Sequence, residues 1–271
     1  MELYYTVLVF ILGTIIGSFL NVVLYRFHTG KSINGHSHCL SCGEPLRWYE
    51  LFPLLSYMCL RGRCRTCSAY IPYRYFLVEF ATGALFVLAW CTIANPVLLG
   101  LSLILSALLM VILVYDLRHT IIPDKLTFLV TVVALLTVSY QAYTHDNWEF
   151  WLAPVLSGFG AAGFYGLLWL ISKGRWIGFG DVKLAFPLGL LVSWPLVFSM
   201  VVYSFWIGAI ISLSIIGVQW LMLRGQFGLS SACLPLTIKS EVPFAPFLIA
   251  AFVLTYFCEF DVLYFMMYAF I

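Results

Sequence analysis

Two pairs of cysteines have a spacing that predicts metal binding. Cys39 and Cys42 form one Cys-x-x-Cys pair, Cys64 and Cys67 form another, and 21 residues separate the pairs. Each pair would present two sulfurs to one tetrahedral ion, so the two pairs would complete a four-thiolate zinc site. Two disulfides are the alternative, and they would require an oxidising compartment. We therefore expect a structural zinc module with Cys39, Cys42, Cys64 and Cys67 as ligands.

Other potential metal ligands lack this spacing. His36 and His38 could substitute for a cysteine, but exposure to solvent is the simpler expectation for both. The remaining cysteines are expected to be packing residues or incidental thiols: Cys59, Cys91, Cys233 and Cys258.

Three aspartates lie at the ends of apolar segments. Asp116 closes one segment, Asp124 opens the next, and Asp181 opens a later one after Gly178-Phe179-Gly180. Ionisable groups at membrane depth are costly, which makes each a functional candidate. Two carboxylates that share a site cannot both ionise cheaply, so they offer an acid and a base together. Peptide hydrolysis by an activated water needs that combination, and Asp116 with Asp181 is the predicted pair.

Structural roles remain open for the same aspartates. Asp124 and Asp181 could each cap the start of a helix. Asp116 could instead be paired with Arg118 or Lys125. The residues alone do not decide between these roles and catalysis.

The amino-acid composition indicates the class of protein in which these side chains lie. Of the 271 residues, 63% are hydrophobic and 10% are charged. Soluble domains have about 45–50% apolar and about 25% charged residues, and disordered chains are less hydrophobic still. Both classes are excluded, and a helical protein that crosses the membrane several times is predicted.

We expect an all-α polytopic membrane protein with about eight transmembrane helices and a cytoplasmic zinc-binding loop. The chain divides into the first helix (1–25), the zinc loop (26–75) and the remaining helices with the aspartates (76–271). The sixth and eighth expected spans are short, which leaves their boundaries uncertain by several residues. The expected spans are Tyr4–Tyr25, Phe76–Ala94, Val97–Tyr115, Leu126–Tyr143, Phe150–Ile171, Val182–Val192, Leu196–Leu223 and Phe244–Cys258.

The basic residues predict the orientation. All 14 Lys and Arg fall between spans one and two, three and four, five and six, or seven and eight. Cytoplasmic loops carry the Lys and Arg of membrane proteins, so these loops are expected inside and both termini outside. The lipid bilayer explains the basic charge of the zinc loop, and no nucleic-acid partner is expected.

Several segments together resemble the bacterial type IV prepilin peptidases. The similarity runs in order from Gly17 to about Phe247, with Phe76 where the family usually has Pro and Ala245 where it has Gly. The matching segments are Gly17–Arg26, the two cysteine pairs, Pro53–Tyr57, Leu60–Cys64, Arg74–Glu79, Asp116–Asp124, Gly178–Lys183 and Pro243–Phe247.

This resemblance implies an intramembrane aspartic endopeptidase of the bacterial inner membrane. Its substrates would be prepilins of a pilus or pseudopilins of a secretion system, cut after a glycine on the cytoplasmic side. Many members then methylate the new N-terminus with S-adenosylmethionine. The resemblance makes Asp116 and Asp181 catalytic, gives Asp124 no catalytic role of its own, and links Gly62 to methyl transfer.

Two other classes of protein were weighed. A transporter would also place acidic residues in broken membrane helices, but no inverted repeat is visible here. A scaffold that only holds pilins would not need two aspartates at the membrane edge. Replacing both aspartates with asparagine would leave a scaffold working.

Overall fold

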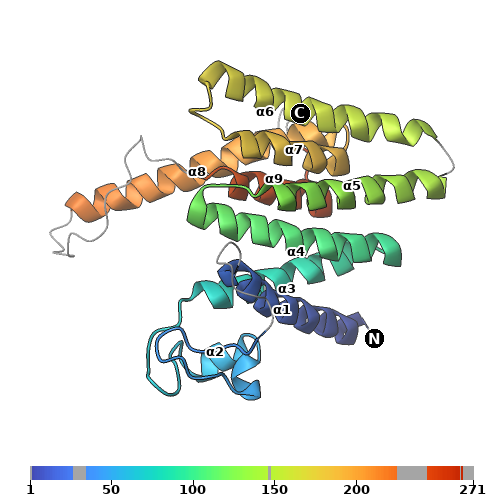
Figure 1. The fold of residues 1–271 in the computed structure, drawn as a ribbon. Helices are drawn as coiled ribbons and strands as arrows, with labels where there is room; N and C mark the ends of the chain where they lie inside the picture. Colours follow the sequence, from blue (N-terminus) through green and yellow to red (C-terminus); the bar gives the residue numbers. More distant parts are fainter. Residues whose placement is uncertain (1, 27–34, 146–147, 225–242, 263, 265–271) are drawn as a thin grey trace. The chain divides into compact units, whose positions relative to one another are not determined.

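The computed structural model describes residues 2–26, 35–145, 148–224, 243–262 and 264 (Figure 1). The chain separates into two compact units, Met1–Tyr115 and Asp116–Ile271. The regular elements among the described residues are all helices. Two isolated β-bridges occur there, but no strand. The prediction of an all-helical membrane protein is therefore confirmed.

The first unit contains two closely packed helices and the cysteine-bearing loop between them. Its elements are α1 (Glu2–Arg26), η1 (Trp48–Leu51), α2 (Leu55–Cys59), α3 (Arg74–Thr92) and most of α4 (Pro96–His119). Helix α1 packs along α3. Glycines permit this approach, since a Cβ on Gly13 would lie 2.8 Å from the Cα of Gly83. Small residues at such contacts are typical of helices that associate in membranes.

A hydrogen bond attaches the loop to α3, and a second one joins α1 to α3. The backbone N–H of Leu54 donates to Glu79 Oε2 of α3 at 2.8 Å. Asn21 of α1 donates through Nδ2 to the carbonyl oxygen of Tyr75 at 3.1 Å. The loop is thus fixed to α3 at Leu54, and α1 is fixed to the first turn of α3 at Tyr75.

The second unit is organised around one buried helix. Its elements are α5 (Asp124–His145), η2 (Trp148–Trp151), α6 (Leu152–Ser172), α7 (Phe179–Val192), α8 (Leu196–Arg224) and α9 (Ala245–Cys258). Helix α7 packs against α5, α6, α8 and α9 (Figure 1). Its side chains Leu184 and Leu188 are fully buried. The start of α7, where Asp181 lies, is therefore held by its neighbours.

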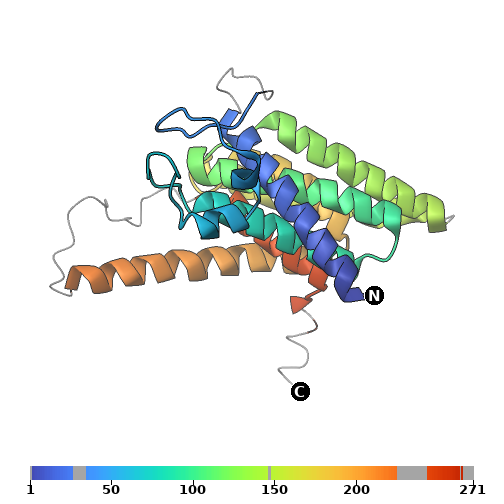
Figure 2. The same ribbon diagram turned by 90° about the horizontal axis from the view of Figure 1, so that it is seen from below.

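Helix α8 contrasts with α7 in its exposure. Its C-terminal half extends away from the other helices of the second unit (Figure 2). Only 11% of the apolar segment within Leu196–Val218 is buried. A long apolar surface of this kind is suited to contact with lipid.

Six helices of the described chain are long and apolar enough to cross a membrane. They are α1, α3, α4, α5, α6 and α8. Helices α7 and α9 have 14 residues each. At 1.5 Å per residue they reach only about 21 Å, short of the roughly 30 Å hydrocarbon core. The expected total of eight spans stays a prediction.

Candidate active site and four-cysteine cluster

The structure places Asp116 and Asp181 close together in the second unit. Asp116 lies near the C-terminal end of α4, and Asp181 lies in the first turn of α7. The two residues are 4% and 6% exposed. The Asp116 carboxylate is near enough to repel that of Asp181 electrostatically. The two side chains that the sequence pairs are thus brought into one buried site.

Each carboxylate is held by one backbone N–H group. Gly178 donates to Asp181 Oδ2 at 3.1 Å. This bond lies in the first turn of α7, so Asp181 does cap the start of the helix. Capping uses only one of its two carboxylate oxygens. The N–H of Ala245, at the start of α9, donates to the Asp116 carboxylate. Because that donor is a backbone group, alanine supplies it as well as glycine would.

The second oxygen of each carboxylate has no such partner. Asp116 Oδ2 and Asp181 Oδ1 are both buried and accept no hydrogen bond from the described residues. Buried polar atoms are nearly always satisfied, so an unsatisfied pair in one site calls for an explanation. Two buried carboxylate oxygens left without a partner in one site are the groups that a general acid and a general base would use.

The glycine before Asp181 allows close packing. A Cβ on Gly180 would lie 3.1 Å from the Cβ of Ile122, which precedes α5. Glycine at this position therefore lets the start of α7 approach the segment that leads into α5. This contact fixes where the Asp181 side chain begins.

Two polar residues beside this site were missed by the sequence reasoning. Tyr165 of α6 is fully buried, and its hydroxyl lies 2.7 Å from Ser204 Oγ of α8. Its ring packs on Phe244, next to Ala245, with 5.7 Å between centroids. Both residues are polar and lie within apolar spans. Polar side chains in such spans usually form hydrogen bonds between helices, and this could have pointed to them.

Asp124 is separate from the buried pair. It is the first residue of α5, and its Oδ1 lies 2.8 Å from Lys183 Nζ of α7. The Asp124 side chain is 74% exposed. It therefore ties the starts of two helices together at the surface.

The four predicted cysteines converge in the first unit. The sulfurs of Cys39, Cys42, Cys64 and Cys67 all lie within 4.8 Å of one another. Cys39 Sγ and Cys67 Sγ, from different pairs, are 3.8 Å apart. Zinc–sulfur bonds of about 2.3 Å in a tetrahedron put sulfurs about 3.8 Å apart. The donor set and its spacing thus fit a tetrahedral metal ion.

The two cysteine pairs lie in matching turns. Cys39 donates its N–H to Glu44 at 2.9 Å, and Cys64 donates its N–H to Ala69 at 2.8 Å. The residue after each second cysteine has positive φ, +75° at Gly43 and +55° at Ser68. The backbone N–H of Cys42, with that of Ser41, lowers the pKa of the Cys39 thiol to about 6. This favours the thiolate, the form that binds metals, at Cys39. Against the lowering effect of the Glu44 N–H, burial and the sulfurs of Cys39 and Cys67 raise the pKa of the Cys42 thiol to about 11.

The other potential ligands lie outside the cluster. His38 Nδ1 is 3.3 Å from the carbonyl oxygen of His36, at an exposed position. Cys59, Cys91 and Cys258 are exposed free thiols. Cys233 falls outside the described residues.

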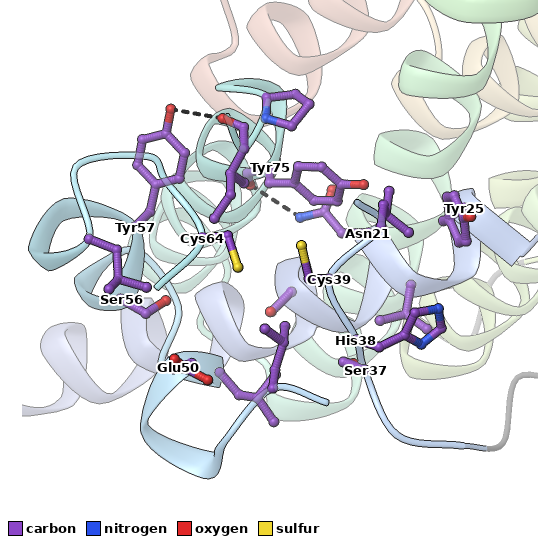
Figure 3. A pocket seen from close by; sticks show the side chains of 18 of the residues that line it. Asn21, Tyr25, Ser37, His38, Cys39, Glu50, Ser56, Tyr57, Cys64 and Tyr75 are labelled. Atoms are coloured by element: carbon purple, nitrogen blue, oxygen red, sulfur yellow. Dashed lines mark hydrogen bonds between the residues drawn. The ribbon is translucent and has the colours of Figure 1, made fainter. Parts of the chain in front are cut away.

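A cavity of about 540 Å³ lies between the cysteine loop and helices α1 and α3. Figure 3 shows Cys39 and Cys64 at its wall, together with Asn21, Tyr57 and Tyr75. Gly62 is not among the residues that line it, but Gly62 packs directly against Tyr57. Gly62, which the family resemblance links to methyl transfer, therefore contacts a residue of the cavity wall without lining the cavity itself.

Comparison with known proteins identifies the family. The model of the bacterial peptidase A24 N-terminal domain matches residues 11–93, and that of the type IV leader peptidase family matches residues 103–213. A prepilin leader peptidase/N-methyltransferase of Klebsiella pneumoniae is 36% identical over 68% of this chain and 84% of its own length. The chain belongs to the type IV leader peptidase family. The predicted resemblance is confirmed.

Other relatives in the type IV leader peptidase family bear the same name. The protein of Vibrio cholerae is 29% identical over 95% of this chain and 98% of its own length. That of Myxococcus xanthus is 32% identical over 83% of this chain, which spans only 65% of that relative. No solved structure gives a significant match.

Proposed function

We propose that this chain is an aspartic endopeptidase of the bacterial inner membrane that removes leader peptides from prepilins or pseudopilins, and that it then N-methylates the product. The names of its relatives in the type IV leader peptidase family support both activities. The observation that carries the proteolytic part is the buried pair of carboxylates, each with one unpartnered oxygen.

In the proposed mechanism, Asp116 and Asp181 share one proton. The ionised aspartate takes a proton from a water molecule, and that water attacks the scissile carbonyl carbon. The protonated aspartate donates to the carbonyl oxygen, and the roles then reverse as the leaving amine is protonated. The N–H groups of Gly178 and Ala245 hold the carboxylates in place during these transfers.

The position of the aspartates suits a substrate at the membrane edge. A prepilin is basic before the cut and apolar after it, so its apolar helix would lie in the bilayer and its leader in the cytoplasm. Asp116 and Asp181 lie at helix ends, where a bond between those two parts would be found. This placement requires the basic loops inside and both termini outside, as the positive charges predict.

We further propose that Cys39, Cys42, Cys64 and Cys67 hold a structural zinc ion. The four sulfurs have the type and spacing that zinc requires, and a loop of this size has little core of its own. Metal analysis of the purified protein against a Cys67→Ser variant tests this. One zinc per chain, lost in the variant, is expected, whereas equal and near-zero zinc in both would refute it.

The catalytic assignment is tested by replacing each aspartate with asparagine. Asp116→Asn and Asp181→Asn should each lower leader cleavage in membranes by about 10²–10⁴-fold, because one proton-transfer group is lost. Asp124→Asn is the matched control, since it makes the same chemical change at an exposed position. Normal cleavage by either buried-site variant would overturn the pair, and would suit a scaffold or transporter instead.

A further inference from the structure

The second unit contains an apolar groove beside the aspartate pair. The groove lies between α6, α8 and the start of α9, and its volume is about 690 Å³. This is within the roughly 300–1,000 Å³ usual for ligand-binding clefts. Phe205 of α8 and Phe247 of α9 belong to its walls, and Trp176 and Ile177 come from the connection between α6 and α7. Nothing in the proposed proton transfers uses this groove.

We propose that the groove binds the apolar segment of the prepilin or pseudopilin, the part that follows the scissile bond. The proposal rests on the proteolytic part of the proposed function. It assigns substrate selection to a surface outside the aspartate pair, whereas the two carboxylates perform the hydrolysis.

The groove is continuous with the aspartate site. Ile177 lines the groove, and the residue that follows it donates its N–H to Asp181. Phe244 also lines the groove, and the residue that follows it donates its N–H to Asp116. The backbone segments that hold the two carboxylates therefore also form part of the groove wall. A chain bound in the groove lies next to the bond that the carboxylates would cut.

Tyr165 joins the groove wall to the surroundings of Asp181. Its ring packs on Phe205 and Phe244, with 6.1 and 5.7 Å between centroids, and both of these residues line the groove. Tyr165 itself is fully buried and is near enough to Asp181 to experience the charge of its carboxylate. A single buried side chain thus connects the wall of the groove with the catalytic pair.

The charges around the groove favour the apolar part of the substrate over the basic leader. None of the described residues that line the groove carries a charge at neutral pH. The connection that supplies Trp176 also carries Lys173 and Arg175, both of them exposed. These two cations would repel a basic leader. An uncharged apolar segment can enter the groove without burying a charge.

Trp176 indicates the depth at which the groove opens. Its side chain lines the groove and is 69% exposed. Tryptophan is enriched at the interface between membrane and water. The opening is therefore expected at that interface, where the substrate changes from basic to apolar.

Gly208 controls the width of the groove. A Cβ on Gly208 would lie 3.0 Å from Cδ2 of Phe247, and both residues line the groove. Glycine allows the Phe247 ring to lie directly against the α8 backbone. Any side chain at position 208 would shift that ring within the groove wall.

Two model prepilins test the assignment on the full-length protein in detergent. Both have a basic leader that ends in glycine, followed by an apolar segment of about 20 residues. In one substrate the first two helical turns after the cut, about eight residues, are leucine and phenylalanine, and in the other they are alanine. The unaltered protein should cleave the bulky substrate with a KM about tenfold lower, because its side chains fill the groove.

Ser212→Phe fills the groove from α8. It should raise the KM for the bulky substrate about tenfold and leave kcat near normal, because the carboxylates are unaltered. The KM for the alanine substrate should change much less, since small side chains still fit. Ser214→Phe is the matched control, because it makes the same change on the same helix at an exposed position outside the groove lining. It should cleave both substrates as the unaltered protein does.

Gly208→Ala and Gly217→Ala form a second pair that favours the helix. Each replaces glycine with a better helix former inside α8. The new methyl group of Gly208→Ala would contact Phe247, whereas a Cβ on Gly217 would meet no atom within 4 Å. Only Gly208→Ala should raise the KM for the bulky substrate. Thermal unfolding of all four variants shows that the fold is retained.

The outcomes separate this inference from the proposed function. Equal effects of Ser212→Phe and Ser214→Phe, or equal rises in KM for both substrates, would overturn the groove assignment and would suit a groove filled by lipid. Cleavage persists in those cases, so the proposed function stands. Failure of the unaltered protein to cleave either substrate would overturn the proposed function itself. A rise in KM confined to the bulky substrate and to the two groove variants supports the proposal.

Discussion

The Tyr165 hydroxyl donates a hydrogen bond to Ser204 Oγ, with 2.7 Å between the two oxygens. The direction follows from Ser204, which gives its own proton to the carbonyl oxygen of Val201 at 2.7 Å. The bond joins α6 to α8 beside Asp181 and is fully buried. Removing the Ser204 hydroxyl would therefore leave the Tyr165 hydroxyl without its acceptor. Removing the Tyr165 hydroxyl would leave Ser204 bonded to Val201.

This asymmetry predicts unequal effects of two substitutions on stability. Ser204→Ala leaves the buried Tyr165 hydroxyl unsatisfied and should lower the free energy of unfolding by about 1–3 kcal/mol. Tyr165→Phe leaves Ser204 bonded to Val201 and should cost only about 0.5–1.5 kcal/mol. Thermal unfolding in detergent measures both. A larger loss for Tyr165→Phe would contradict the donor assignment.

The salt bridge between Lys183 and Asp124 should contribute little. Both side chains are substantially exposed, at 40% and 74%, so solvent weakens their attraction. We expect a double-mutant cycle of unfolding free energies, built from Asp124→Asn, Lys183→Met and the double variant, to give a coupling energy of about 0–1 kcal/mol. Leader cleavage should remain measurable in all three. Loss of cleavage in Asp124→Asn alone, with the fold intact, would give Asp124 a chemical role instead.

Gly180 should be required for catalysis rather than for folding. A Cβ there would lie 3.1 Å from the Cβ of Ile122 and would shift the start of α7 by a few tenths of an ångström. Misplacement by 1 Å can cost about 10²-fold in rate, so Gly180→Ala should lower kcat for cleavage by about tenfold.

Gly163→Ala is the control for this prediction. Gly163 lies within α6, and a Cβ there would meet no atom within 4 Å. Alanine favours a helix over glycine by about 1 kcal/mol, so this variant should keep full cleavage and equal or higher thermal stability. Equal losses of kcat in both variants would remove the argument for Gly180.

Much of this arrangement could be anticipated from residue types and spacing. The cysteine cluster follows from two short spacings, because each Cys-x-x-Cys turn is a local structure. The pairing of Asp116 with Asp181 could be anticipated because both lie at helix ends expected on one side of the membrane. The six long helices could be located from hydropathy, because the apolar character of each one is a property of its own stretch of sequence.

The remainder depends on tertiary contacts that no local pattern reports. Any residue except proline can supply the backbone N–H that Ala245 donates to Asp116. The residue type at position 245 therefore does not reveal this role. Tyr165 and Ser204 look like ordinary members of apolar segments until α6 and α8 meet. Gly62 has meaning only beside Tyr57, and the loop fold brings these two together.

Metal removal should loosen the cysteine loop and leave the aspartate pair working. Cys39 and Cys64 belong to the sulfur cluster and also line the cavity of the first unit. Chelation, or Cys42→Ser, should therefore loosen the loop around this cavity and raise the rate of trypsin cleavage at Arg61 and Arg65 at least tenfold, and added zinc should restore resistance after chelation. Leader cleavage should fall much less, because Asp116, Asp181 and their N–H donors, Gly178 and Ala245, all belong to the second unit.

Cys59→Ser is the matched control for the metal experiment. Cys59 is exposed like Cys42 and lies in the same loop, but it is outside the sulfur cluster. Its substitution should leave zinc content and trypsin resistance unchanged, as measured by metal analysis and limited proteolysis. If Cys42→Ser removed the zinc and the loop resisted trypsin as well as before, the sulfur cluster would not be what holds the loop together.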